Sequence, residues 1–519
     1  VHEKFAIFNE GAERFETGTP PIMNAILLGI ALQMIRESEN KELFQTKRND
    51  FDWKEILTVG DMGENPLESF QQMHIGRGVS VPVVGGKKTY VNFDGAASTP
   101  SFEPIWQAFC DALQLSDEDQ MQLVQASLTK LREFYGAPEE EYDFVFACNT
   151  SEAINYAVRN LEAHDFGEID PVVVNSVLEH HSNELPWRLS SVFQLVRTEV
   201  DNHGFIDLGA LDALLKEYNV EKKHGQQRIV VMAVSGASNV LGTFNPLDEI
   251  AEVCHRYDVQ VIVDGAQLSA HRKVDLHAST VDYYGLSAHK MYSPFGAGGL
   301  FIRKGSKYVM NEICQNGFPN AAGVAALAKS AALLDLIGFE RIEAYERELT
   351  IKALDLLRQY PDLYIYGMKD PTSTGFKDKG PAIVFEHHEI PHNLLAKYLA
   401  DYGAIGTRNG CFCAHMLVSK RLMEIEEWRP QAVKIIFALK GNWFKPLLPG
   451  LVRVSFGIEN DEEDLNQLKQ ALDRISTIQI GPVNRWLARV HEGTWILPDS
   501  GAEEAVQSFI HHQVGKVFP

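Results

Sequence analysis

Two short segments of the chain carry side chains that could do chemistry together. Ser287-Ala288-His289-Lys290 follows a strand-like apolar run at 282–286. A lysine at the end of a buried strand is costly as a cation, so Lys290 is expected to have a lowered pKa, to be paired or to be used covalently. Asp264 ends the apolar run 260–264, where a carboxylate is either held by local hydrogen bonds or paired with a protonated ring nitrogen of a cofactor.

A third segment supplies a site for an anion. Asn149-Thr150-Ser151-Glu152 follows the strand-like run 142–147 and opens a helical stretch. Hydroxyls and free N–H groups at a helix start can bind a phosphate, although such residues taken alone are usually only helix caps. The order and spacing of the three segments are those expected if their strands end at one edge of a single sheet.

The elements that must position these residues alternate between strand and helix. Apolar β-rich runs are found at 142–147, 171–177, 228–234, 260–264 and 298–303. Helical stretches at 151–164 and 246–259 separate some of them, which predicts a mostly parallel sheet with helices on both faces, an α/β fold. The expected organisation is an N-terminal extension (1–75), a large α/β domain (76–320), a smaller α+β domain (321–480) and a C-terminal extension (481–519).

Composition narrows the function classes. The 519 residues are 45% hydrophobic and 23% charged, as in globular enzymes, and a net charge of −22 disfavours nucleic acid as a partner. No run is long and apolar enough to cross a membrane, and no secretory signal is visible, so no membrane partner is expected. Because the net charge disfavours polyanions, the ligand is expected to be a small molecule. Six cysteines without a regular framework suggest reduced thiols in the cytoplasm.

Taken together, these segments resemble class V, fold-type I pyridoxal-phosphate enzymes, the group of cysteine desulfurases and selenocysteine lyases. The resemblance runs from about residue 85 to residue 475. It is carried by YVNFDGAAST (90–99), EHHSN (179–183), SGASNVLG (235–242), VDGAQ (263–267) and SAHK (287–290).

The resemblance implies pyridoxal 5′-phosphate as cofactor and a role for each matching residue. Lys290 would bind the cofactor covalently and move protons, Asp264 would pair with the ring nitrogen, Gln267 would hydrogen-bond the phenolic oxygen, and His180 would stack on the ring. The phosphate would be held by Thr150, Ser151, Ser287 and His289. The carboxylate of an amino-acid substrate would be bound by Arg453, Asn239 and Arg408.

The segment 407–415, TRNGCFCAH, resembles the loop that carries the desulfurase nucleophile, which places that role on Cys413. Arg408 and His415 would act as cations that lower the thiol pKa, whereas Cys148 and Cys254 are expected to be buried. The loop also resembles that of molybdenum-cofactor sulfurases, so Cys411 remains an alternative nucleophile. Two other interpretations are a buried structural cysteine and a metal site, and we expect no metal.

The family resemblance also implies a homodimer and a protein acceptor for sulfur. In the family, a threonine after the lysine reaches the phosphate of the partner subunit. This chain has Phe318 at that place and a similar segment at 15–29, where Thr19 would take over the contact unless the segment is only an amphipathic helix. Other functions compatible with the sequence are a class V aminotransferase, an epimerase or another lyase without thiol catalysis, and a non-catalytic scaffold.

Overall fold

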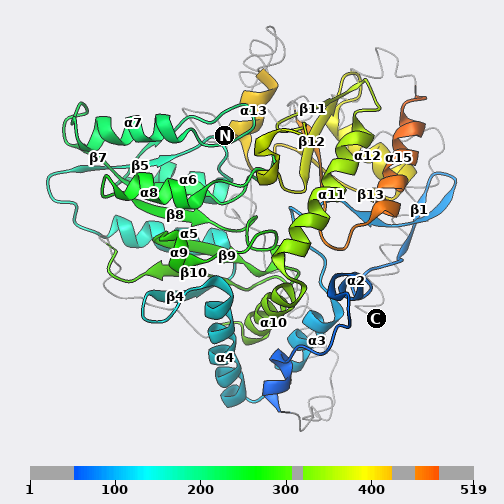
Figure 1. Ribbon diagram of the computed structural model, residues 1–519, viewed down its shortest axis with the longest axis horizontal. Helices are drawn as coiled ribbons and strands as arrows, with labels where there is room; N and C mark the ends of the chain where they lie inside the picture. The colour runs from blue at the N-terminus through cyan, green and yellow to red at the C-terminus, as the bar shows by residue number, and fades with distance from the viewer. Residues whose placement is uncertain (1–51, 307–318, 424–449, 479–519) are drawn as a thin grey trace, which may run out of the picture.

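The computed structural model describes residues 52–306, 319–423 and 450–478. Within these ranges the chain forms a large α/β unit and a smaller α+β unit, with α11 (Phe339–Leu357) between them (Figure 1). Thr19 and Phe318 lie outside the described residues.

The large unit is built on a seven-stranded sheet in which only β10 runs against the other strands. In spatial order the strands are β4 (Tyr142–Ala147), β10 (Gly298–Arg303), β9 (Tyr283–Ser287), β8 (Gln260–Asp264), β7 (Gln227–Ser235), β5 (Asp170–Asn175) and β6 (Gln194–Arg197). The apolar runs at 142–147, 260–264 and 298–303 coincide with β4, β8 and β10. The expected α/β fold with a mostly parallel sheet is confirmed.

Helices cover both faces of this sheet because successive strand residues point to opposite sides. In β5, Val172 and Val174 pack in one apolar core and Val173 packs in another. The first core is covered by α3 (Glu103–Ala112), α4 (Asp117–Tyr135), α7 (Leu208–Asn219), α8 (Leu247–His255) and α10 (Ala321–Ile337). The second is covered by α5 (Thr150–Glu162) and α6 (His181–Leu189).

The smaller unit has a four-stranded antiparallel sheet packed against helices. Its strands, in spatial order, are β11 (Leu363–Ile365), β12 (Ala382–His387), β15 (Leu451–Ser455) and β14 (Arg408–Gly410), and its helices are α11, α12 (His392–Gly403) and α15 (Glu462–Ile475). Val91 and Phe93, from the early part of the chain, pack in the core of this unit. They arrive there because β3 (Val91–Asn92) pairs in parallel with β13 (Ile405–Gly406).

The packing places α10 differently from the sequence-based expectation. The boundary expected at residue 320 would put this helix in the smaller unit, but its buried residues belong to the core of the large unit. The physical reason is its composition, AAGVAALAKSAALLDLI, which is apolar on nearly all sides and therefore needs burial all round. The change from one core to the other comes within α11, where Ile342 packs in the first core and Leu349 in the second.

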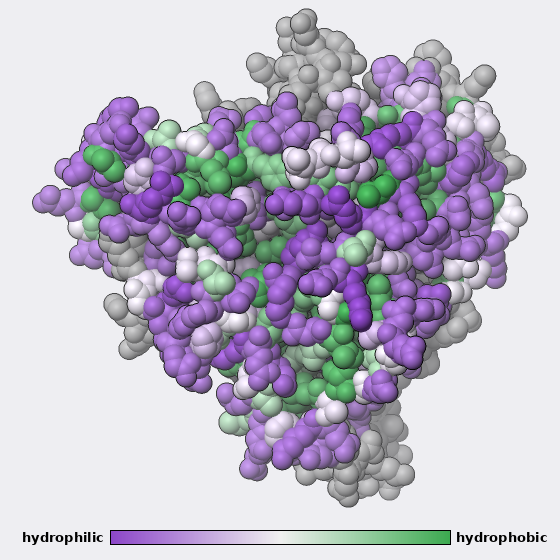
Figure 2. Space-filling model, in the orientation of Figure 1, coloured by the Kyte–Doolittle hydropathy of each residue, from purple (hydrophilic) through white to green (hydrophobic). Residues whose placement is uncertain are grey.

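The remaining elements are short or lie at the periphery. They are η3 (Trp53–Leu57), α2 (Pro66–Gln71), β1 (Ser80–Val83), β2 (Gly86–Thr89), α9 (Leu276–Ser279), η4 (Ala288–Lys290), η5 (Thr374–Asp378) and α13 (His415–Met423). The face drawn in Figure 2 is mainly hydrophilic, with hydrophobic residues in patches between the polar ones. In the described part of the chain, no single helix is long and apolar enough to span a membrane, and the pair α10 and α11 meets that criterion only jointly, with a bend of 80°.

Gly298, the first residue of β10, lies where the sheet is tightly packed, so a substitution there tests the packing. A Cβ at this position would overlap the carbonyl oxygen of Leu286 and approach Asn149 Cα to 3.0 Å, and neither backbone atom can move away cheaply. We expect Gly298→Ala to lower the free energy of unfolding by about 1–3 kcal/mol in chemical denaturation. Gly60→Ala is the control, because a Cβ there meets no atom within 4 Å. Equal stability of the two variants would contradict this packing.

Candidate active site

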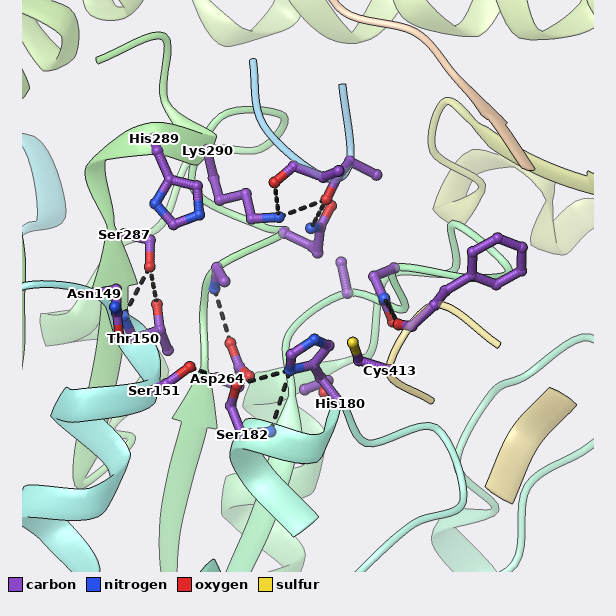
Figure 3. A pocket seen from close by; sticks show the side chains of 18 of the residues that line it. Asn149, Thr150, Ser151, His180, Ser182, Asp264, Ser287, His289, Lys290 and Cys413 are labelled. Atoms are coloured by element: carbon purple, nitrogen blue, oxygen red, sulfur yellow. Dashed lines mark hydrogen bonds between the residues drawn. The ribbon is translucent and has the colours of Figure 1, made fainter. Parts of the chain in front are cut away.

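A cavity of about 310 Å³ opens at the edge where β4, β7, β8 and β9 end, facing the smaller unit. Most of the residues selected from the sequence lie around it (Figure 3). Those on its wall are Thr150, Ser151, His180, Asn239, Asp264, Gln267, Ser287, His289, Lys290, Arg408, Cys413 and Arg453. The chain therefore brings residues up to 303 positions apart to one place.

Lys290 ends η4, directly after β9, and its amine is held by backbone carbonyls rather than by a carboxylate. Nζ donates to the carbonyl oxygens of Ala96 at 2.5 Å and Ala97 at 2.8 Å. Burial, together with the nearby Arg453 cation, lowers the pKa of this amine to about 7. A large fraction of the amine is therefore neutral near pH 7, the form in which it is a nucleophile.

Asp264 and Gln267 lie at the end of β8, the strand next to β9, with Asp264 on the strand and Gln267 in the turn that follows it. Asp264 is the last residue of β8, is 6% exposed and accepts a hydrogen bond from the Ala266 amide at 3.1 Å. Burial raises its pKa to about 6, so a cationic partner in the cavity would stabilise its charged form. Gln267 Nε2 donates to Ala96 O at 2.7 Å, the same carbonyl oxygen that binds Lys290.

The opposite end of the cavity has the features of an anion site. Asn149 caps α5 by accepting a hydrogen bond from the Glu152 amide at 3.0 Å. Next to it, the Thr150 amide donates to Ser287 Oγ at 2.7 Å, and the hydroxyls of Thr150 and Ser287 are 2.8 Å apart. Ser151 Oγ lies 2.6 Å from Ser182 Oγ. Hydroxyls gathered at the N-terminus of a 13-residue helix fit a phosphate group.

The environment of His289 indicates whether this end of the cavity suits a phosphate. The residue is buried, its ring lies against that of Phe295 with centroids 5.0 Å apart, and neither ring nitrogen has a partner among the described residues. Burial holds its pKa well below the ordinary value, so the ring is neutral and has one N–H to donate. Because buried polar atoms are nearly always satisfied, these nitrogens indicate a missing anionic partner.

His180 lies between the two ends. It caps α6, with Nδ1 accepting from the Ser182 amide at 3.2 Å and lying 2.7 Å from Ser182 Oγ. Burial lowers its pKa to about 3, so the ring is neutral at pH 7. The neighbouring Glu179 is buried, and the sequence motif alone did not predict a role for it in the site. Its carboxylate accepts from Ser176, Asn183 and Ser235, and burial raises its pKa to about 7.

The wall on the smaller unit carries arginines. Arg453, on β15, is 2% exposed; its Nη2 donates to Asp94 at 2.6 Å and its Nη1 to Asn239 O at 2.8 Å. Arg453 Nε has no partner among the described residues. Arg408 lies at the mouth, 57% exposed, with Nη1 at 4.0 Å from Asp94. Asp94 was not selected as a site residue, although it lies within YVNFDGAAST, the first of the motifs that carry the family resemblance.

The two cysteines of the loop after β14 differ in environment. Cys413 is exposed and lines the cavity, whereas Cys411 is partly buried beside an apolar cluster and burial raises its pKa to about 11. Phe412 and Cys413 both have positive φ, 53° and 54°, which turns the loop sharply. The structure therefore favours Cys413 as the reactive thiol.

Two expectations about this region are corrected. Burial lowers the pKa of His415 to about 4, and its ring bonds to His181, so it supplies no cation beside Cys413. Cys148 is exposed rather than buried, because it follows the end of β4, whereas Cys254 is buried as expected. Among the described residues, no three His, Cys, Asp or Glu side chains are grouped so that they could hold a metal ion.

The fold and this site define a pyridoxal-phosphate-dependent enzyme of fold type I. A family model, aminotransferase class-V, matches residues 92–468, and the chain belongs to that family. The residue types around the cavity fit pyridoxal phosphate. They provide an amine for its aldehyde, a carboxylate for its ring nitrogen, and hydroxyls at a helix start for its phosphate.

Known relatives are similar over most of their lengths. A probable cysteine desulfurase of Halalkalibacterium halodurans is 28% identical over 66% of this chain and 80% of its own. A cysteine desulfurase of Dickeya dadantii is 30% identical over 56% of this chain and 72% of its own. Among solved structures, the apo cysteine desulfurase of Thermococcus onnurineus is similar in fold, with a TM-score of 0.61, 23% identity, and coverage of 74% of this chain and 94% of that one.

The lowered pKa of Lys290 predicts how the cofactor is taken up. Because the folded protein shifts this amine from 10.5 to about 7, its neutral form grows as the pH rises through about 7. The rate at which apoprotein binds pyridoxal phosphate, followed by the visible absorbance band, should rise over that range and level off above it. Lys290→Ala should give no such band. A rise centred near 10.5 would show that the reacting amine is exposed.

Proposed function

We propose that the protein is a cysteine desulfurase, which converts L-cysteine to L-alanine and leaves the sulfur as a persulfide on Cys413. The observation that carries this proposal is that the exposed thiol of Cys413 and the buried amine of Lys290 line one cavity. The names of the relatives support the same reaction.

The cofactor is held by residues at three points of the cavity. Lys290 would be its covalent anchor, Asp264 would pair with the ring nitrogen, Gln267 would hydrogen-bond the phenolic oxygen, and His180 would stack on the ring. Thr150, Ser151, Ser287 and His289 would hold the phosphate. When bound, pyridoxal phosphate withdraws electrons from the bonds at the α-carbon of an amino acid. The raised pKa of Asp264 supports its role, because a protonated ring nitrogen is the partner that keeps its carboxylate charged.

The substrate carboxylate binds to Arg453. Its guanidinium is already oriented by Asp94 and by the carbonyl of Asn239, and its Nε lacks a partner in the described part of the chain. Arg408, at the mouth, adds a second positive charge. A buried, pre-oriented guanidinium binds a carboxylate more strongly than a flexible surface cation does.

Two residues of this chain move the reacting groups. Lys290 Nζ takes a proton from the α-carbon of the substrate and returns a proton to the side-chain carbon that loses sulfur. The Cys413 thiolate attacks the substrate sulfur, so that the carbon–sulfur bond breaks and a sulfur–sulfur bond forms. The products are alanine and a Cys413 persulfide, with no external oxidant or reductant.

The persulfide then passes to a protein acceptor, for which the exposure of Cys413 leaves a route. The enzyme works as a homodimer, and sedimentation of the holoenzyme at assay concentration tests that part. The five described cysteines form no disulfide with one another, which supports a cytoplasmic location.

Cys413→Ser tests the reaction itself. The variant should keep its cofactor absorbance and still show a spectral change with L-cysteine, because Lys290, Asp264 and Arg453 are unchanged. Alanine formation should fall by several orders of magnitude, because a hydroxyl is a poor nucleophile at neutral pH.

Cys411→Ser is the matched control, two residues away in the same loop, and should keep most of the activity. Loss of activity in Cys411→Ser alone would move the nucleophile to Cys411. Full activity in both variants would show elimination without a persulfide. A wild type that turns over only other amino acids would make the protein an aminotransferase or another lyase of this family.

A further inference from the structure

Two histidines join the Cys413 loop to the large unit. His181 is the first residue of α6, and His415 is the first residue of α13. Their ring nitrogens, Nε2 of His181 and Nδ1 of His415, lie 2.9 Å apart. The rings are nearly parallel, at 10°, with centroids 4.6 Å apart. One hydrogen bond therefore links residues 234 positions apart in the sequence.

The same helix start also binds the backbone of Cys413. The His181 amide donates to Cys413 O at 2.8 Å, so both the amide and the ring of His181 bind this loop. One residue earlier, Asn239 Nδ2 donates to Phe412 O at 2.8 Å. Cys413 has a φ of 54°, a conformation that residues other than glycine keep only when surrounding contacts hold them there. These contacts are what hold it.

The pair is suited to act as a fixed link. Burial lowers the pKa of His181 to about 2 and that of His415 to about 4, so both rings are neutral near pH 7. A neutral imidazole has one donor and one acceptor nitrogen, so the two rings share one directional hydrogen bond. Neither ring lies on the wall of the active cavity, which excludes direct contact with the substrate there.

We propose that His181 and His415 are positioning residues that latch the Cys413 loop onto α6 and keep the thiol at the cavity. The latch acts on sulfur transfer and not on substrate binding, because Arg453 and Lys290 are held by other contacts. Its kinetic consequence rests on the proposed desulfurase function, whereas its effect on the loop does not.

A double-mutant cycle on the holoenzyme tests the latch. His181→Ala and His415→Ala should each speed hydrogen–deuterium exchange in peptides that cover 177–186 and 405–418, and the double variant should add little to either, because one bond is lost in all three. His415→Asn should restore most of the protection, since its amide reaches the position of Nδ1. His224→Ala, which removes a ring stacked on Tyr218 in another part of the molecule, is the control and should leave these peptides unchanged.

The kinetic arm measures alanine formation from L-cysteine in the same variants. Each Ala variant should lose roughly 10- to 100-fold in kcat, as expected for a misplaced reacting group, while KM stays near the wild-type value. Additive effects in the cycle, or unchanged exchange in the loop peptides, would overturn the latch. A wild type that makes no alanine would overturn the proposed function alone, and the exchange cycle would still decide on the latch.

Discussion

The site depends on one constraint, the burial of the Lys290 amine against backbone carbonyls. Ala96 and Ala97, which provide these carbonyls, follow β3, the strand that pairs with β13 in the smaller unit. The stretch that follows β3 also bonds to Ser455 of β15 and carries Asp94, which orients Arg453. One stretch of chain thus sets the lysine and the arginine relative to each other, and its position depends on both units being folded.

Burial alone does not make a lysine reactive. The side chain of Lys379 is buried and its pKa is also lowered to about 7, but its amine is enclosed by the carbonyls of Gly380 and Ala382 and does not line the active cavity. Lys290 has the same lowered basicity and also faces space for an aldehyde. Lys290 therefore combines a buried amine with access to the cavity. Of the two loop cysteines, the exposed Cys413 lines the same cavity, whereas the partly buried Cys411 packs against an apolar cluster.

The sequence allowed the central strands and most of the cavity wall to be predicted, because these depend on local patterns. The strands that end at Asp264 and shortly before Lys290 are short and buried, and the reactive side chains lie at or just after their ends. The parts that were missed depend on contacts distant in sequence. Asp94 and Arg453, which form an ion pair, are 359 positions apart in the sequence. The carbonyls that bind Lys290 could not be predicted, because every residue type has a backbone carbonyl. His415 was expected to be a cation because its ring partner 234 positions away was not visible.

The central claim is that Lys290, and no other buried amine, carries the cofactor. Sodium borohydride reduction of the holoenzyme followed by peptide mapping tests it most directly, because reduction fixes the cofactor to the amine that holds it. The added mass should lie on the peptide that contains Lys290, with the Lys379 peptide unmodified. Added mass on Lys379, or on any lysine outside the cavity, would show that another amine binds the cofactor.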